Sequence, residues 1–230
     1  MFLSKLQLDP RSPTATRDLT NAHAMHQRVM SGFEDGQYES ARRQHQVLFR
    51  LERTRDGRPI VIIQSQARPN WTKLPENYLL PGTTPETRSL DDLLASIRPG
   101  GRYRFRLAAN PTKRLRTHTS TPGKRVELKD MTDLFEWFSR RALRAGFEPG
   151  VDSDFSLDPA TSGTSWENAV RVVQQERVYG VREGTRVTFG GATFEGILKV
   201  SQLEPFLSAL REGIGSGKAY GFGLLSIAPL

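Results

Sequence analysis

Residues 45–66 read HQVLFRLERTRDGRPIVIIQSQ, and this stretch decides the fold. Two runs rich in apolar and β-branched residues, His45–Arg53 and Pro59–Gln66, flank the dipeptide Asp56-Gly57. An Asp-Gly pair suits a tight turn, and runs of this composition are typical of strands. The stretch therefore predicts an antiparallel hairpin.

The segment before the hairpin predicts one strand and one helix. Leu6 and Leu8 alternate with polar residues, which indicates a strand at 2–8. A helix is expected from about Thr20, with Asp18 or Thr20 as its N-cap. The apolar stripe of that helix is Ala22, Met25, Val29 and Phe33.

The segment after the hairpin completes a ferredoxin-like order. Four prolines between 67 and 88 predict a loop, and a short helix is expected at 89–97. At 101–108 apolar residues alternate with arginines, which predicts a strand. The resulting order is βαββαβ. The last of these strands can also open the second half of the chain.

The second half again mixes strands with two helices. Asp130 or Thr132 is expected to cap a helix that ends near Gly146, with Leu134, Phe138, Ala142 and Ala145 on one face. Strand-like runs follow at 168–179, 184–189 and 192–200, then a helix at 202–211 and a strand at 224–228. We predict an α+β protein of two tandem ferredoxin-like (RRM-like) domains, residues 1–98 and 99–230.

The charge of the chain favours a polyanionic partner. Lys and Arg number 33 against 25 Asp and Glu, which gives a formal charge of +8. Between Arg98 and Lys129 there are ten basic residues and one acidic residue, Glu127. The chain has no cysteine, no signal-peptide pattern and no apolar run long enough for a membrane span. We therefore expect a cytoplasmic protein that binds nucleic acid and no membrane.

The glycine-rich stretch 213–223 is the most unusual motif. Five glycines there after Glu212 permit close approach to a phosphate. A nucleotide-binding P-loop is excluded, because Glu212 replaces its first glycine and Ala219 replaces its magnesium-binding hydroxyl residue. RNA contact and an ordinary tight connection both remain open.

His23 and His26 stand three residues apart on the first helix, so their side chains leave the same side. Two imidazoles at one site can supply the base and the acid of phosphodiester transesterification. Spacing alone favours the alternative that His26 is a boundary residue of the core. The histidines are scattered and the carboxylates do not cluster, so we expect no metal site and no cofactor.

At these motifs the chain resembles the CasE family of CRISPR-associated endoribonucleases. The resemblance runs through Phe2-Leu3-Ser4-Lys5-Leu6, Asp18-Leu19-Thr20-Asn21, Met25-His26, Asn110-Pro111-Thr112-Lys113-Arg114, Gly123-Lys124-Arg125-Val126 and Gly221-Phe222-Gly223-Leu224-Leu225-Ser226. It implies tandem ferredoxin-like domains and a metal-independent cut on the 3′ side of a CRISPR repeat hairpin. It also implies that the hairpin-bearing product is retained with other subunits of the Cascade complex.

The resemblance places His26 on the catalytic histidine of the family. His23 stands where the family commonly has tyrosine, and no lysine follows soon after His26, so Arg28 or Lys218 is left to supply a cation. We expect RNA contacts from a larger basic and glycine-rich set: Arg28, Arg102, Arg104, Arg106, Lys113, Arg114, Arg116, Lys124, Arg125, Arg140, Arg141, Gly215, Gly217 and Lys218.

Two other functions are compatible with the charge of the chain. A non-catalytic RNA-binding subunit of a ribonucleoprotein has the same composition and fold, and differs only in leaving RNA uncut. A basic DNA-binding regulator is disfavoured, because the sequence has no helix-turn-helix or zinc signature.

Overall fold

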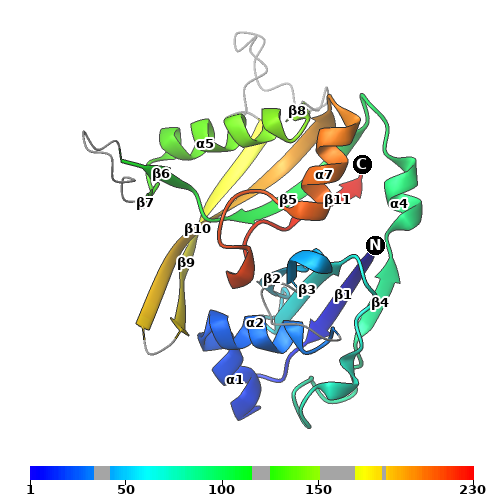
Figure 1. Cartoon of the computed structure of the whole chain (residues 1–230), viewed down its shortest axis with the longest axis vertical. Helices are drawn as coiled ribbons and strands as arrows, with labels where there is room; N and C mark the ends of the chain where they lie inside the picture. The colour runs from blue at the N-terminus through cyan, green and yellow to red at the C-terminus, as the bar shows by residue number, and fades with distance from the viewer. Residues whose placement is uncertain (34–41, 116–124, 151–168, 183–184) are drawn as a thin grey trace.

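The computed structural model describes residues 1–33, 42–115, 125–150, 169–182 and 185–230. Within these ranges the chain forms two large antiparallel sheets and a separate two-stranded hairpin, and helices cover one face of each large sheet (Figure 1). The predicted α+β architecture of tandem ferredoxin-like domains is confirmed by the strand orders given below.

The first sheet has the order β2-β3-β1-β4. Its strands are β1 (Phe2–Gln7), β2 (Leu48–Arg53), β3 (Pro59–Ser65) and β4 (Glu86–Ser89). The predicted hairpin is confirmed as β2 and β3, with Leu51 opposite Val61 and Gly57 at φ +81° in the turn. Neighbouring strands are all antiparallel, which is the ferredoxin-like arrangement.

Two helices follow β1 in the described residues up to 33, where the sequence predicted one. They are α1 (Pro13–Thr20) and α2 (Ala22–Met30). The helix predicted from about Thr20 is α2, although its N-cap is Asn21 and not Asp18 or Thr20. Helix α1, which Ser12 caps and which has proline at its first position, was not predicted. Asn21, with φ −133° and ψ 102°, separates the helices. Both helices pack on the first core, around Leu6, Met25 and Phe49.

The connection from β3 to β4 departs from the ferredoxin-like pattern. It contains the 3₁₀ turn η1 (Trp71–Lys73), and the short helix α4 (Asp91–Ser96) follows β4 instead of preceding it. Residues 67–88 were predicted to be a loop, but this segment contains most of β4, which pairs with β1. Strand β4 was not predicted, because it is four residues long and mostly polar and exposed.

The second sheet has the order β11-β5-β10-β8, with β9 also paired to β10. Its strands are β5 (Arg102–Ala109), β8 (Phe147–Pro149), β9 (Val170–Arg182), β10 (Thr185–Val200) and β11 (Leu225–Pro229). The strand predicted at 101–108 therefore opens the second half. The runs predicted at 184–189 and 192–200 are one long strand with an irregularity between Phe189 and Gly191.

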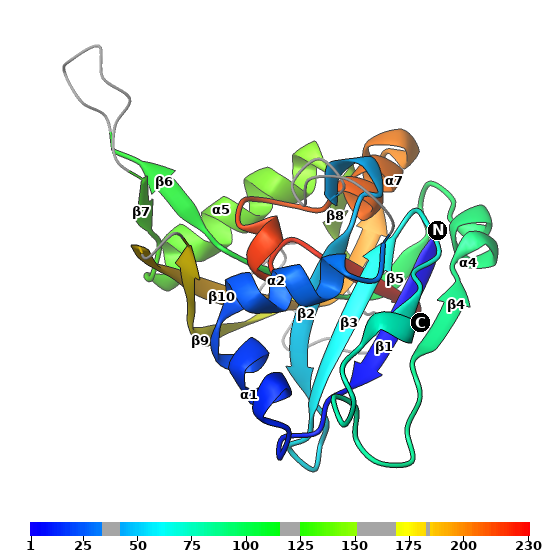
Figure 2. The ribbon, with the colours of Figure 1, turned by 60° about the horizontal axis from the view of Figure 1, so that its bottom comes forward.

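The second core lies between this sheet and two helices, α5 (Met131–Arg144) and α7 (Leu203–Glu212). Asp130 caps α5, and the predicted apolar face of α5 is buried. Two hairpins extend beyond this core. One is formed by β6 (Thr112–Arg114) and β7 (Arg125–Glu127), and the other is the far end of β9 and β10, which reaches α1 and α2 (Figure 2).

Candidate active site

Helix α2 begins at Ala22 because Asn21 caps it. The side-chain oxygen of Asn21 accepts hydrogen bonds from the amides of His23 (3.1 Å) and Ala24 (3.5 Å). The first amides of a helix have no partner inside it, so this cap satisfies two of them. The cap thereby fixes the turn that carries His23, with His26 one turn further on.

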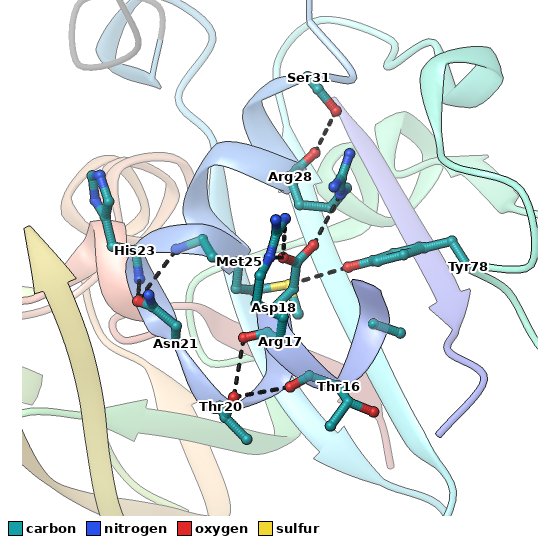
Figure 3. Close-up of polar contacts among 12 residues, drawn as sticks. Thr16, Arg17, Asp18, Thr20, Asn21, His23, Met25, Arg28, Ser31 and Tyr78 are labelled. Atoms are coloured by element: carbon teal, nitrogen blue, oxygen red, sulfur yellow. Dashed lines mark hydrogen bonds and ion pairs between the residues drawn. The ribbon is translucent and has the colours of Figure 1, made fainter. Parts of the chain in front are cut away.

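The two histidines of α2 differ in burial. His26 is 7% exposed, and its ring stacks on that of Phe49 in β2 with 6.5 Å between centroids and 22° between planes. His23 is half-buried, and Figure 3 shows its side chain pointing away from the polar cluster around Asp18. The imidazole of His26 therefore packs on the core, whereas that of His23 is partly accessible to a ligand.

Asp18 is fully buried within α1 and is not the helix cap that the sequence suggested. Its carboxylate accepts hydrogen bonds from Arg17 (2.9 Å) and Arg28 (2.9 Å), and the Arg28 guanidinium lies 5.1 Å from the Tyr78 ring centroid (Figure 3). A buried carboxylate is stable only when it is paired. Asp18 therefore ties α1 to α2 beneath the histidines.

The buried carboxylate of Asp18 affects the accessibility of Arg28 and the ionisation of Tyr78. The Arg28 side chain is 17% exposed and is held by Asp18, so it is poorly placed for the RNA contact suggested from sequence. Burial raises the pKa of Tyr78, and the negative charge of Asp18 raises it further. The Tyr78 phenol thus stays neutral, and Lys218 becomes the better candidate for the cation beside the histidines.

The glycine-rich loop between α7 and β11 lies against the histidine helix. Its 3₁₀ turn, η2 (Lys218–Tyr220), contacts both α2 and β2. A Cβ atom at Gly221 would lie 3.3 Å from the Phe49 ring, which also stacks on His26. The loop therefore reaches the histidine through one aromatic ring.

Lys218 is half-buried in η2. Burial lowers the pKa of its ammonium group, the positive charge of Arg42 lowers it further, and Glu212 acts in the opposite direction. Several positive charges thus converge near α2, which is an environment that favours a phosphate.

Gly215 and Gly217 have φ angles of +87° and +77°. A Cβ atom at Gly215 would lie 3.2 Å from the Trp137 ring, and one at Gly217 would lie 2.9 Å from the Phe222 ring. Both glycines are therefore required by backbone conformation and close packing. Their suggested contact with RNA stays a prediction.

The three arginines of β5 alternate with core residues and lie on the face of the second sheet that α5 and α7 leave open. Arg106 forms ion pairs with Glu52 of β2 (3.2 Å) and Glu195 of β10 (2.7 Å), so it joins the two domains. It also lines a cleft of about 390 Å³ between β2 and the second sheet. Arg104 is exposed and Arg102 is half-buried. Arg106 is exposed as well, but two carboxylates hold it.

The β6–β7 hairpin is short and basic. Arg114 and Arg125 are cross-strand partners, and both are exposed. Lys113 forms an ion pair with Asp133 of α5 (3.0 Å). Arg116 and Lys124, also suggested as RNA contacts, lie outside the described residues.

Helix α5 extends the basic surface of this hairpin. Arg140 and Arg144 are exposed, and the Arg141 guanidinium lies 5.5 Å from the Trp137 ring centroid. Burial lowers the pKa of Arg141, and the charges of nearby arginines, including Arg125, lower it further. The hairpin and α5 thus form one cationic surface. We call it the basic patch, made of Arg114, Arg125, Arg140, Arg141 and Arg144.

No group of three His, Asp or Glu side chains that could hold a metal ion is found among the described residues. Within the same ranges, no helix has the length and apolar character needed to cross a membrane. The candidate site therefore consists of His23, His26 and the nearby basic side chains.

A family model described as CRISPR associated protein matches residues 1–229. The chain is also 34% identical to the CRISPR-associated endoribonuclease Cse3 of Thermus thermophilus, over the full length of both proteins. The chain belongs to this CRISPR-associated family. The resemblance to CasE endoribonucleases is confirmed, since Cse3 and CasE are the same family.

Solved structures agree with this assignment. A CRISPR endoribonuclease Cse3 bound to a 19-nucleotide RNA superposes with a TM-score of 0.79 at 33% identity, with both chains fully covered. A chain of a CRISPR RNA-guided surveillance complex, in a pre-nicking state, gives a TM-score of 0.66 at 25% identity, again over both full lengths. The tandem ferredoxin-like fold is thus shared along the whole chain.

Two features of the candidate site were not predicted from the sequence: the capping of α2 by Asn21 and the pairing of Asp18 with Arg28. Asn21 directly precedes the apolar stripe of α2, so its capping role was detectable. The partnership of Asp18 with Arg28 was not, because the two residues are ten positions apart and on different helices.

Proposed function

We propose that this protein is a metal-independent endoribonuclease that cuts precursor CRISPR RNA on the 3′ side of the repeat stem-loop. The observation that carries the proposal is the capped helix bearing His23 and His26, in a chain that matches the endoribonuclease Cse3 from end to end. The name of that relative supplies the reaction class, and the helix supplies the groups that can perform it.

The reaction requires only proton transfers and charge stabilisation from the protein. The 2′-oxygen of the RNA forms a bond to the scissile phosphorus while the bond from phosphorus to the 5′-oxygen breaks. The products are a 2′,3′-cyclic phosphate and a 5′-hydroxyl. One imidazole takes the proton of the 2′-hydroxyl and the other group protonates the leaving 5′-oxygen. We assign these transfers to His26 and His23, and stabilisation of the phosphorane charge to Lys218.

The basic patch is proposed to hold the repeat hairpin. Duplex RNA is recognised mainly through its phosphates and its shape, and exposed arginines suit both. The Cse3 structure with RNA and the chain from a surveillance complex support RNA and other Cascade subunits as partners. We propose that the protein works with these partners in the cytoplasm and that the product stays bound within the complex.

The deciding experiment uses the repeat RNA of the host, with EDTA present throughout. We expect cleavage at one position, and a single 2′-deoxy substitution at the scissile nucleotide should stop cleavage while binding survives. Loss of activity on chelation and its return with magnesium would overturn the metal-independent mechanism. Binding without any cleavage of unmodified RNA would instead identify a non-catalytic RNA-binding subunit.

A further inference from the structure

Asn21 makes one contact that helix capping does not require. Besides the amides of His23 and Ala24, its side-chain oxygen accepts a hydrogen bond of 3.2 Å from the amide of Val181. Val181 lies 160 positions away in β9, within the second domain. One oxygen atom therefore joins the start of the histidine helix to the other half of the molecule.

The backbone around Val181 packs closely on the same turn of α2. Strand β9 contacts both α1 and α2. Gly180 is buried, and a Cβ atom there would lie 3.5 Å from the His23 amide nitrogen and 3.7 Å from the Asn21 oxygen. The hydrogen bond is thus accompanied by ordinary van der Waals packing between this end of β9 and the first turn of α2.

The same strand also contacts the basic hairpin. Arg177 of β9 lies 3.7 Å from Glu127 of β7, and a Cβ atom at Gly190 of β10 would overlap the Glu127 side chain. The β9–β10 hairpin therefore contacts β7 at one point and Asn21 at another. A continuous set of contacts runs from the basic patch to the residue that precedes the histidine helix.

We propose that Asn21 is a positioning residue for cleavage, which holds the first turn of α2 in a fixed relation to the β9–β10 hairpin. RNA bound at the basic patch is then presented to His23 and His26 in a constant geometry. The inference rests on the proposed function, because its main readout is RNA cleavage. The competing explanation is that Asn21 only caps α2, which needs the amides of His23 and Ala24 but not that of Val181.

Two substitutions at residue 21 separate these explanations. Serine caps helices about as well as asparagine, but its oxygen is bonded directly to Cβ and falls short of Val181. Aspartate keeps an oxygen at the original position. Asn21→Ser should retain the melting temperature and the hairpin affinity but lower the single-turnover rate at saturating RNA about tenfold, because small misplacements of reacting groups are costly. Asn21→Asp should cleave at close to the original rate.

Val181→Pro tests the same bridge from the other side, since proline has no amide proton to donate. It should reproduce the loss seen in Asn21→Ser, and the double variant should be no slower than either single variant, because both remove one interaction. An Asn21→Ser protein that cleaves at the original rate would overturn the inference. So would an Asn21→Asp protein that is as slow as Asn21→Ser.

Amide hydrogen exchange gives a readout that does not depend on RNA. In Asn21→Ser the Val181 amide should exchange faster, while the amides of His23 and Ala24 stay protected. Unchanged protection of Val181 would refute the bridge even if the protein cut no RNA. Failure of the original protein to cut repeat RNA would count against the proposed function alone.

Discussion

The histidine helix and the basic patch differ in how their side chains are held. Around α2 the polar groups are paired and at least partly buried: Asp18 accepts hydrogen bonds from two arginines, and Asn21 accepts them from three amides. In the basic patch, Arg114, Arg125 and Arg140 are exposed. The polar groups of the first region are held by specific partners, whereas the second region presents its charge to solvent.

This difference predicts two kinds of mutational effect. A change near α2 should alter the cleavage rate or the folding stability, because each group there has a specific partner. A change in the basic patch should alter affinity and its dependence on salt, because exposed charges act additively and are screened. The variants below test this division, beginning with the largest expected effect.

His26→Ala should slow single-turnover cleavage by a factor of about 100 or more, which is the usual contribution of a proton-transfer residue. RNA affinity should change little, but the melting temperature should fall somewhat, because His26 is buried against Phe49. The measurements are a cleavage time course at saturating RNA, a binding titration and a thermal scan. Cleavage at the original rate would remove His26 from the mechanism, and a stability loss without a rate loss would make it a core residue only.

Asp18→Asn should lower the free energy of unfolding by about 3 kcal/mol, because it leaves the Arg28 charge buried beside a neutral group. Denaturant titration measures this loss. The matched control is Asp56→Asn, whose ion pair with Arg58 is exposed at the hairpin turn and should contribute less than about 1 kcal/mol. Equal losses of unfolding free energy in the two variants would contradict the distinction between buried and exposed ion pairs.

Substitutions at His23 should have an intermediate effect. His23→Tyr introduces the residue common in the CasE family and should retain substantial activity, whereas His23→Ala should be slower than His23→Tyr. The reason is that a phenol can still orient or protonate the reacting groups and a methyl group cannot. Single-turnover rates of both variants at several pH values provide the test. If both variants cleave at the original rate, His23 has no part in the reaction.

Removing two exposed arginines from the basic patch should weaken binding without slowing the chemical step. The double substitution Arg114→Ala and Arg125→Ala should lower the slope of log affinity against log salt by about 1.5 to 2. Lys5→Ala with Lys199→Ala removes the same charge elsewhere and serves as the control. An unchanged slope in the patch variant would show that these arginines do not touch the RNA backbone.

The smallest effect is expected from a substitution of Glu52, which tests its ion pair with Arg106 of β5. Burial alone would raise the pKa of Glu52, but Arg50 and Arg106 lower it on balance. A lowered pKa contributes stability above the ordinary value of 4.5, and this contribution is lost as the pH falls through the lowered value. Glu52→Gln should therefore flatten the loss of stability below about pH 4.5. A slope identical to the original protein would mean that this ion pair does not stabilise the fold.

Local patterns predicted much of the fold. The Asp-Gly hairpin, the apolar face of α5 and the alternation along β5 each depend on residues close together in the sequence, and the structure contains all three. The pattern failed where an element was short or polar, as in β4 and β8, whose existence depends on pairing with a distant strand. The start of α1 was missed although Ser12 and Pro13 form a recognisable signal.

The candidate site was only partly accessible from sequence. The spacing of His23 and His26 put them on one side of a helix, but spacing could not distinguish a catalyst from a core residue. The sequence left Arg28 and Lys218 as equal candidates for the cation, because it could not show that Asp18 and Tyr78 hold Arg28 in a largely buried position. The hydrogen bond between Asn21 and Val181 could not be predicted either, since the two residues are 160 positions apart and lie in separate domains.

The glycine-rich loop follows every other element except β11 in chain order, yet it lies against the helix that carries His26. A ribosome makes the histidine helix early and this loop near the end of synthesis. The ring of Phe49 gains its glycine neighbour, and α2 gains Lys218, only after almost the whole chain has emerged. A nascent chain therefore carries its histidines without the lysine proposed to complete the site, so RNA near the ribosome meets an unfinished nuclease until translation is over.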